Sequence, residues 1–127
     1  MNDIICPCGS AKKYADCCQP FHQQKKAPLS AEQLMRSRYS AFAIPNPEYL
    51  WVTTFPPSRK DHDLEENRNW ANRTSWTKLE ILKSSKTRVE FKAFYTDENG
   101  NENIHHELSV FKYLNHRWYY VSGVFID

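Results

Sequence analysis

Four cysteines near the start of the chain are the residues whose spacing most clearly indicates chemistry. Cys6 and Cys8 form one pair, Cys17 and Cys18 form a second, and no cysteine occurs after them. Zinc binds four soft ligands at the corners of a tetrahedron, and two cysteine pairs on either side of a short loop supply such a set. Gly9 allows the backbone to turn tightly beneath the metal. We therefore expect a zinc site at these four cysteines.

Disulfides, free thiols and an iron–sulfur cluster are the alternatives to zinc. A bridge between Cys17 and Cys18 would join adjacent residues whose Cα atoms are about 3.8 Å apart, which is below the usual disulfide range. A pair such as Cys6 with Cys17 is geometrically feasible but requires an oxidising compartment. Iron–sulfur spacings differ from this one. Zinc with four protein ligands leaves no position for an activated water, so we expect a structural site.

The residues around the cluster are basic. Lys12 and Lys13 lie inside the loop and would offset the formal charge of about −2 on a zinc tetrathiolate. His22 follows Cys18 by four residues and is either a replacement ligand or, as we favour, a surface histidine. The first residues do not resemble a signal peptide, so we expect a cytoplasmic location, where thiols stay reduced.

Arg38 is the first of three candidates for a ligand pocket. It shares the apolar stripe of its predicted helix with Phe42, four residues on. A cation in that position needs a partner or a water-filled cavity. The functional interpretation is an anion-binding arginine. The structural interpretation, which we favour, is an ion pair with a sheet carboxylate such as Glu107 or Glu90, or an aliphatic stem that lies along the apolar surface with its charge in water.

Tyr95 and His106 are the other two candidates for this pocket. His105 and His106 are adjacent in a predicted strand, so their side chains face opposite sides. His106 shares its face with Ile104 and Leu108 and is therefore expected to be the buried one. In a functional pocket, Arg38, Tyr95 and His106 would orient an anion and transfer a proton. A hydrogen-bonded core histidine is the commoner case.

The composition is that of one globular domain with a small appendage. The chain has 127 residues, of which 40% are hydrophobic and 25% are charged, and its formal net charge is +2. This weak balance does not by itself predict binding to nucleic acid or membrane, and no apolar run is long enough to span a bilayer. The motifs of hydrolases, nucleotide-binding proteins and zinc proteases are missing, so we lean towards a non-enzymatic role.

Local patterns predict three helices. Ser30 and Gln33 form a capping box, so a helix should occupy residues 30–43. A short second helix should begin at Pro47, because proline is favoured at the first helical position. A third helix is expected over residues 64–72.

Beyond Trp76 the apolar residues alternate with polar ones, which indicates strands with one buried face. The strands are expected at residues 76–82, 89–95, 104–114 and 118–126. Because helices and strands are segregated, the fold class is α+β, with the helices packed on one face of a four-stranded antiparallel sheet. We place a zinc knuckle at residues 1–24, a linker at 25–29 and the α+β domain at 30–127.

Two segments resemble known families. The pattern Cys6-Pro7-Cys8-Gly9-Ser10, Lys12-Lys13-Tyr14, Cys17-Cys18 is similar to the SEC-C motif, a zinc-binding module also found in the bacterial preprotein translocase ATPase. The stretch Leu34-Met35-Arg36-Ser37-Arg38-Tyr39-Ser40-Ala41-Phe42 resembles the signature helix of the YchJ-like family of bacterial proteins.

These resemblances imply a fold and a metal site. The YchJ-like family has a main domain similar to the cone of nuclear transport factor two. The SEC-C motif implies zinc ligands at Cys6, Cys8, Cys17 and Cys18. The translocase module often ends in Cys-His, whereas Cys17-Cys18 gives four thiolates. The resemblance implies no established activity.

We weigh three functions. The favoured one is a protein-interaction adaptor, in which Lys12, Lys13 and Tyr14 contact a protein partner. The alternative is a small-molecule-binding protein or enzyme that uses the pocket of the cone. The third is nucleic-acid binding through the basic knuckle, where four lysines against two aspartates give residues 1–28 a charge of +2. A homodimer through the open sheet face would use Phe94, Phe111 and Tyr113.

Overall fold

The computed structural model describes residues 4–61 and 64–126 of the chain. The N-terminal segment contains a 3-10 turn, η1 (Tyr14–Asp16), and the short helix α1 (Gln19–His22). The helical layer consists of α2 (Ala31–Ala43), α3 (Pro47–Val52), η2 (Pro56–Asp61) and α4 (Leu64–Arg73). The sheet consists of β1 (Ser75–Ser84), β2 (Arg88–Thr96), β3 (Glu102–Leu114) and β4 (Arg117–Phe125). Among the described residues, no helix is long and apolar enough to cross a membrane.

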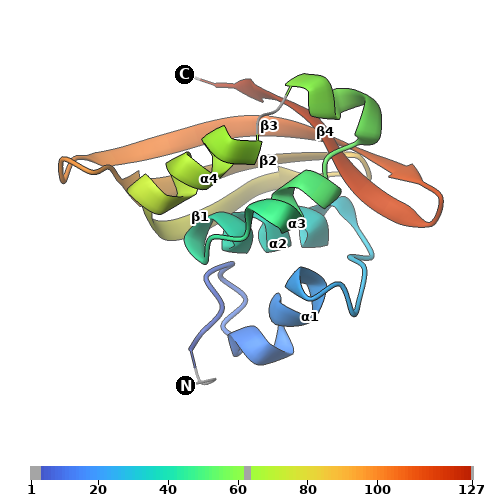
Figure 1. Cartoon of the computed structure of the whole chain (residues 1–127), viewed down its shortest axis with the longest axis horizontal. Coiled ribbons are helices and arrows are strands. Elements are labelled where there is room, and N and C mark those ends of the chain that lie inside the picture. Colours follow the sequence, from blue (N-terminus) through green and yellow to red (C-terminus); the bar gives the residue numbers. More distant parts are fainter. Residues whose placement is uncertain (1–3, 62–63, 127) are drawn as a thin grey trace.

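The helices cover one face of a single antiparallel sheet, whose strand order is β1-β2-β3-β4 (Figure 1). The N-terminal segment lies against α2, at the opposite end of the view from the C-terminus. The predicted α+β architecture is therefore confirmed. The three predicted helices and four predicted strands all form, and their bounds differ from the predicted ones by one or two residues at most positions.

Side-chain caps begin the two helices that the sequence predicted most clearly. The Oγ atom of Ser30 accepts a hydrogen bond from the backbone N–H of Gln33 at 3.1 Å. The Oδ1 atom of Asn46 accepts one from Tyr49 at 3.1 Å, and Pro47 occupies the first helical position. Each cap satisfies a backbone donor that has no partner inside the helix. The caps therefore fix the residue at which each helix begins.

Two tight loops set the register of the sheet. Asn115 and His116 have φ values of +50° and +67°, which suits a two-residue hairpin between β3 and β4. Gly100, with φ +84°, lies in the loop between β2 and β3. The resulting register pairs Phe91 with Glu107 and Val89 with Ser109. Cross-strand partners share a face, so this register decides which residues of β3 point toward the helices.

The main core lies between α2 and the inner face of the sheet. Its buried members are Ala31, Leu34, Met35, Tyr39, Leu79, Val89, Phe91, Ala93, Phe111 and Trp118. The prediction that Phe111 lies on the open sheet face is wrong, because its side chain is only 2% exposed and packs in this core. On the open face, Phe94 is half-buried and Ile104 is 56% exposed. Dimerisation through that face stays a prediction.

Candidate functional site

The four cysteine sulfurs converge at one point of the N-terminal segment. The Sγ atoms of Cys6, Cys8, Cys17 and Cys18 all lie within 4.8 Å of one another. Cys8 Sγ is 3.6 Å from Cys17 Sγ, which is 4.0 Å from Cys18 Sγ. Ligands that sit 2.3 Å from a tetrahedral zinc ion are about 3.8 Å from each other. All four residues are free thiols, so the cluster has the donor set and the size of a zinc tetrathiolate site and forms no disulfide.

The backbone presents the two cysteine pairs from different local structures. The first pair sits in a tight loop, closed by a hydrogen bond from Cys6 N–H to the carbonyl of Lys12 at 2.8 Å. Gly9 in that loop adopts φ +86°, as the predicted turn requires. The second pair follows η1 and leads into α1. A loop and a helix start thus face each other across the sulfurs. We call residues 4–22 the knuckle.

The thiols do not ionise independently. Contacts of the Cys6 thiol with the sulfurs of Cys18 and Cys8 lower the pKa of Cys6. The same contact with Cys6 raises the pKa of Cys18. Burial raises the pKa of Cys17, although the hydroxyl of Ser10 lies 3.2 Å from its sulfur and opposes the rise. Four adjacent thiolates repel one another, and a divalent cation among them would remove that penalty.

The knuckle is packed against α2 through the cysteines themselves. Cys6, Cys8 and Cys18 are at most 2% exposed. The Ser40 hydroxyl donates to Cys18 Sγ at 3.4 Å and lies 3.5 Å from Cys6 Sγ. Arg36 Nη1 donates to the carbonyl oxygen of Cys8 at 2.6 Å. The metal-binding candidate is therefore shared between the knuckle and the helix that begins the cone.

His22 is buried, so the expectation of a surface histidine is wrong. Its side chain is 8% exposed, and its Nε2 donates to the carbonyl oxygen of Ser37 at 2.8 Å. Its Nδ1 therefore accepts from the hydroxyl of Tyr14 at 2.7 Å. Burial lowers the pKa of His22 and favours this neutral form. With both nitrogens occupied, His22 joins the knuckle to α2 and is not a metal ligand.

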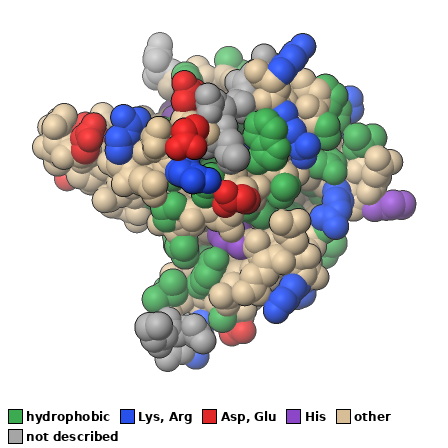
Figure 2. Space-filling view, viewed as in Figure 1, with side chains coloured by type: hydrophobic (Ala, Val, Ile, Leu, Met, Phe, Trp, Pro, Cys, Tyr) green, Lys and Arg blue, Asp and Glu red, His purple; other side chains and the backbone are tan. Residues whose placement is uncertain are grey.

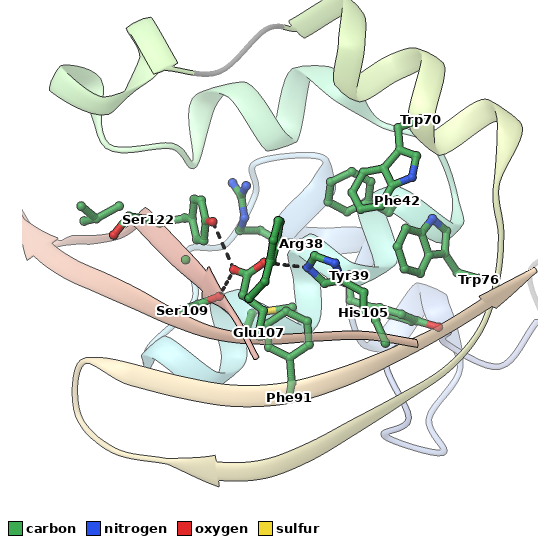
Figure 3. Close-up of a pocket in the computed structure, with 16 residues that line it drawn as sticks. Arg38, Tyr39, Phe42, Trp70, Trp76, Phe91, His105, Glu107, Ser109 and Ser122 are labelled. Atoms are coloured by element: carbon green, nitrogen blue, oxygen red, sulfur yellow. Dashed lines mark hydrogen bonds and ion pairs between the residues drawn. The ribbon is translucent and has the colours of Figure 1, made fainter. Parts of the chain in front are cut away.

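A cavity of about 400 Å³ lies between the helices and the sheet (Figure 3). One end carries the rings of Phe42, Trp70 and Trp76, and the other carries polar groups around Glu107. The cavity is lined by Met35, Arg38, Tyr39, Phe42, Trp70, Trp76, Phe91, Ala93, His105, Glu107, Ser109, Tyr120, Val121, Ser122, Gly123 and Phe125. Apolar walls with a few convergent polar groups are typical of small-molecule sites.

Glu107 is the centre of the polar end. It is 7% exposed, and three dashed lines converge on it in Figure 3. His105 Nε2 lies 2.7 Å from Oε1, while the hydroxyls of Ser109 and Tyr120 donate to Oε2 at 2.5 and 3.1 Å. Burial alone would raise the pKa of Glu107, but the hydrogen bonds outweigh it and hold the pKa below its ordinary value of 4.5. The buried carboxylate is therefore ionised near neutral pH.

Gly123 makes room for this carboxylate. It pairs with Ser109 across β3 and β4, and a Cβ atom at this position would overlap the carboxylate of Glu107. Glycine at this strand position therefore has a packing reason, since any side chain would displace the acidic group.

Arg38 lines the same cavity and is 7% exposed. Its Nη1 atom donates to the carbonyl of Leu50 at 2.9 Å and to the hydroxyls of Thr53 and Thr54 at 2.6 and 3.4 Å. Its guanidinium lies over the ring of Tyr120, 4.4 Å from the centroid. Within the described ranges these contacts replace the ion pair that we expected with a sheet carboxylate. Tyr120 links Arg38 to Glu107, because its ring lies beneath the guanidinium and its hydroxyl donates to Glu107 Oε2.

The other two predicted pocket residues do not line the cavity. Tyr95 packs beside it, with its ring 4.9 Å from that of Trp76. The placement of His106 is wrong: its Nε2 lies 2.8 Å from Glu90 Oε2 on the other face of the sheet, and His105 takes the inward position. On β3, His105, Glu107 and Ser109 face the cavity, whereas the apolar Ile104 and Leu108 face away from it. The more apolar face of this strand is therefore the outer one, and hydrophobicity indicates the wrong side.

Models of two known families match the two parts of the chain. The sequence model of the family described as "YchJ, middle NTF2-like domain" matches residues 30–123, and that of the SEC-C motif matches residues 5–20. This chain belongs to the YchJ-like family. The two resemblances drawn from residues 6–42 are thereby confirmed.

Similar proteins support the same assignment. A UPF0225 protein of Actinobacillus succinogenes is 43% identical over 125 residues, covering 94% of this chain and 80% of the relative. A UPF0225 protein of Geobacter sulfurreducens is 40% identical, covering 94% and 78%. The solution structure of a SEC-C motif containing protein from Rhodopseudomonas palustris matches with a TM-score of 0.87 and 38% identity, covering 98% of this chain and 100% of that one. A crystal structure of another such protein, from Psychrobacter arcticus, matches with a TM-score of 0.80 and 36% identity, covering 95% and 82%.

We predict that Glu107→Gln destabilises the protein by about 2 kcal/mol at pH 7, because three donors lose an ionised acceptor. A carboxyl whose pKa is lowered by folding stabilises the folded state above its unfolded pKa, and this stabilisation is lost as the pH falls through the folded value. The difference in free energy of unfolding between wild type and variant should therefore shrink below pH 4.5. Denaturant titrations between pH 3 and 7 measure it. A difference that stays constant over this range would mean that folding does not shift the pKa of Glu107, and one that moves in favour of wild type as the pH falls would mean that folding raises the pKa.

Proposed function

We propose that the four cysteines hold one structural Zn²⁺. The observation that carries this proposal is the mutual approach of the four sulfurs within 4.8 Å, in a chain that belongs to a SEC-C-containing family. Zinc would supply a closed tetrathiolate centre that fixes the loop and the helix start relative to each other. Such a centre contributes folding free energy to a segment too short to have an extensive core. We place the protein in the cytoplasm, where these thiols stay reduced.

We further propose that the knuckle is a protein-interaction module. Its metal-binding side faces α2, whereas Lys12 and Lys13 are exposed on the loop between the cysteine pairs. Tyr14, the third predicted contact residue, is half-buried and bonded to His22, so only part of its ring would reach a partner. A rigid loop that carries two exposed cations suits an acidic protein surface.

The cavity supports a second candidate function, the binding of a small molecule. Its volume of about 400 Å³ falls within the range of ligand sites. Its polar end around Glu107 lies beside an aromatic end, and this mixture of apolar walls and a few polar groups supports a ligand role. Nucleic-acid binding has weaker support, because acidic and basic side chains are interspersed over the face seen in Figure 2 rather than gathered by sign.

The zinc proposal predicts about one zinc ion per chain when the protein is purified without chelator. A Cys17→Ser/Cys18→Ser variant should lose the metal, because two of the four thiolate ligands are removed. Elemental analysis by mass spectrometry measures the metal content of both proteins. The control is Ser85→Ala, at an exposed position between β1 and β2. Full occupancy in the double variant, or iron in place of zinc in the wild type, would contradict the proposal.

The adaptor proposal predicts that Lys12→Glu/Lys13→Glu abolishes capture of a protein partner while zinc content and thermal stability stay unchanged. The matched control is Lys25→Glu/Lys26→Glu, which makes the same charge change outside the cysteine loop. Affinity purification with quantitative mass spectrometry compares the two variants with wild type. Equal loss in both variants, or no loss in either, would count against the knuckle loop as the contact surface.

A further inference from the structure

The hydrogen-bonding groups that face the cavity are not all used by the chain. Both oxygens of Glu107 are covered, Oε1 by His105 and Oε2 by Ser109 and Tyr120. A ligand therefore gains little by offering Glu107 a further donor. Glu107 keeps its negative charge, but the three donors stabilise that charge, so it repels an anion less than a bare carboxylate would.

Arg38, in contrast to Glu107, has hydrogen-bonding atoms that the described residues do not use. Within the described part of the chain, only its Nη1 has hydrogen-bond acceptors, and its Nε and Nη2 have none. The residue is more than nine-tenths buried and lines the cavity. Neither of these two atoms is among the fully buried unpaired ones, so an acceptor in the cavity can reach them, and the planar fork of a guanidinium matches a carboxylate. The hydroxyl of Ser122 also lines the cavity and has no hydrogen-bond partner among the described residues.

The spacing along α2 relates this cation to the aromatic end. Phe42 follows Arg38 by four residues, so the two lie on one face of the helix about 6 Å apart along its axis. Phe42 packs edge-on against Trp70, with ring centroids 5.4 Å apart, and Trp70 against Trp76 at 5.1 Å. At the rim, the ring of Phe125 lines the cavity although the residue is 75% exposed. A flat ring that enters the cavity would cover this exposed aromatic surface.

We propose that the cavity binds a planar conjugated carboxylate, whose ring packs on Trp70, Trp76 and Phe125 and whose carboxylate pairs with Arg38. This inference rests on the small-molecule role proposed above and names the chemical class of its ligand. The separation between the cation and the rings suits an acid in which the carboxylate is attached directly to a ring. The cavity volume of about 400 Å³ accommodates one such molecule.

Three probes that share a naphthyl ring and differ in charge test the assignment on the unaltered, metal-loaded chain. They are naphthalene-2-carboxylate, naphthalene-2-carboxamide and 2-naphthylmethylammonium, titrated by isothermal calorimetry at pH 7. We expect the carboxylate to bind at least tenfold more tightly than the carboxamide, and the ammonium most weakly. Equal affinities, or a preference for the ammonium, would overturn the assignment of class but leave a small-molecule site. No binding by any probe would count against the small-molecule function itself.

Two further measurements locate the bound acid. Arg38→Gln should bring the carboxylate and carboxamide affinities within about threefold, whereas Arg88→Gln, at an exposed position of β2, should change neither. In the wild type, NMR should detect contacts between naphthyl protons and the ring protons of Trp70 and Phe125. If Arg38→Gln does not fold, these contacts alone decide whether the acid binds in the cavity. A carboxylate preference without them, or one that persists in folded Arg38→Gln, would overturn the proposal.

Discussion

Buried polar contacts hold α2 from two sides, and the rest of the molecule is arranged around that helix. On one side, the knuckle reaches it through the Arg36 bond to Cys8, the His22 bond to Ser37 and the Ser40 contact with Cys18. On the other side, the Arg38 guanidinium enters the cavity of the cone. His22, Ser40 and Arg38 are buried, so each of them costs free energy if its partner is missing. The knuckle therefore packs directly on α2, and the metal-binding candidate and the cavity share this one helix.

Most of the architecture could be predicted from local signals in the sequence. The Ser30 cap and the proline at position 47 mark where helices begin, and alternating residues mark the strands. These signals act over a few residues, so a single sequence carries them completely. The cysteine cluster was equally accessible, because two close pairs on a short loop leave the sulfurs few other arrangements. The burial of His22 could not be predicted in this way, because its partner Ser37 is 15 residues away in the sequence.

Hydrophobicity predicts the wrong inner face for β3, so it does not identify the polar end of the cavity. Apolar Ile104 and Leu108 indicated the wrong face. The correct signal was the register: a hairpin that pairs Thr96 with Glu102 also pairs Phe91 with Glu107. Since Phe91 lies on the clearly apolar face of β2, its partner had to point inward too. The hydrogen bonds of Arg38 to the end of α3, by contrast, depend on helix packing that no local pattern encodes.

The claim that the knuckle holds the cavity wall is tested most directly by hydrogen exchange of the backbone amides in α2. The measurement compares metal-loaded protein with protein stripped by a chelator, using the amides of β2 and β3 as internal references. If the knuckle braces α2, amides over residues 34–41 exchange at least tenfold faster after metal removal, while those of the central strands keep their protection. Unchanged protection in α2 after the metal is lost would contradict this account, because the cone would then stand without the knuckle.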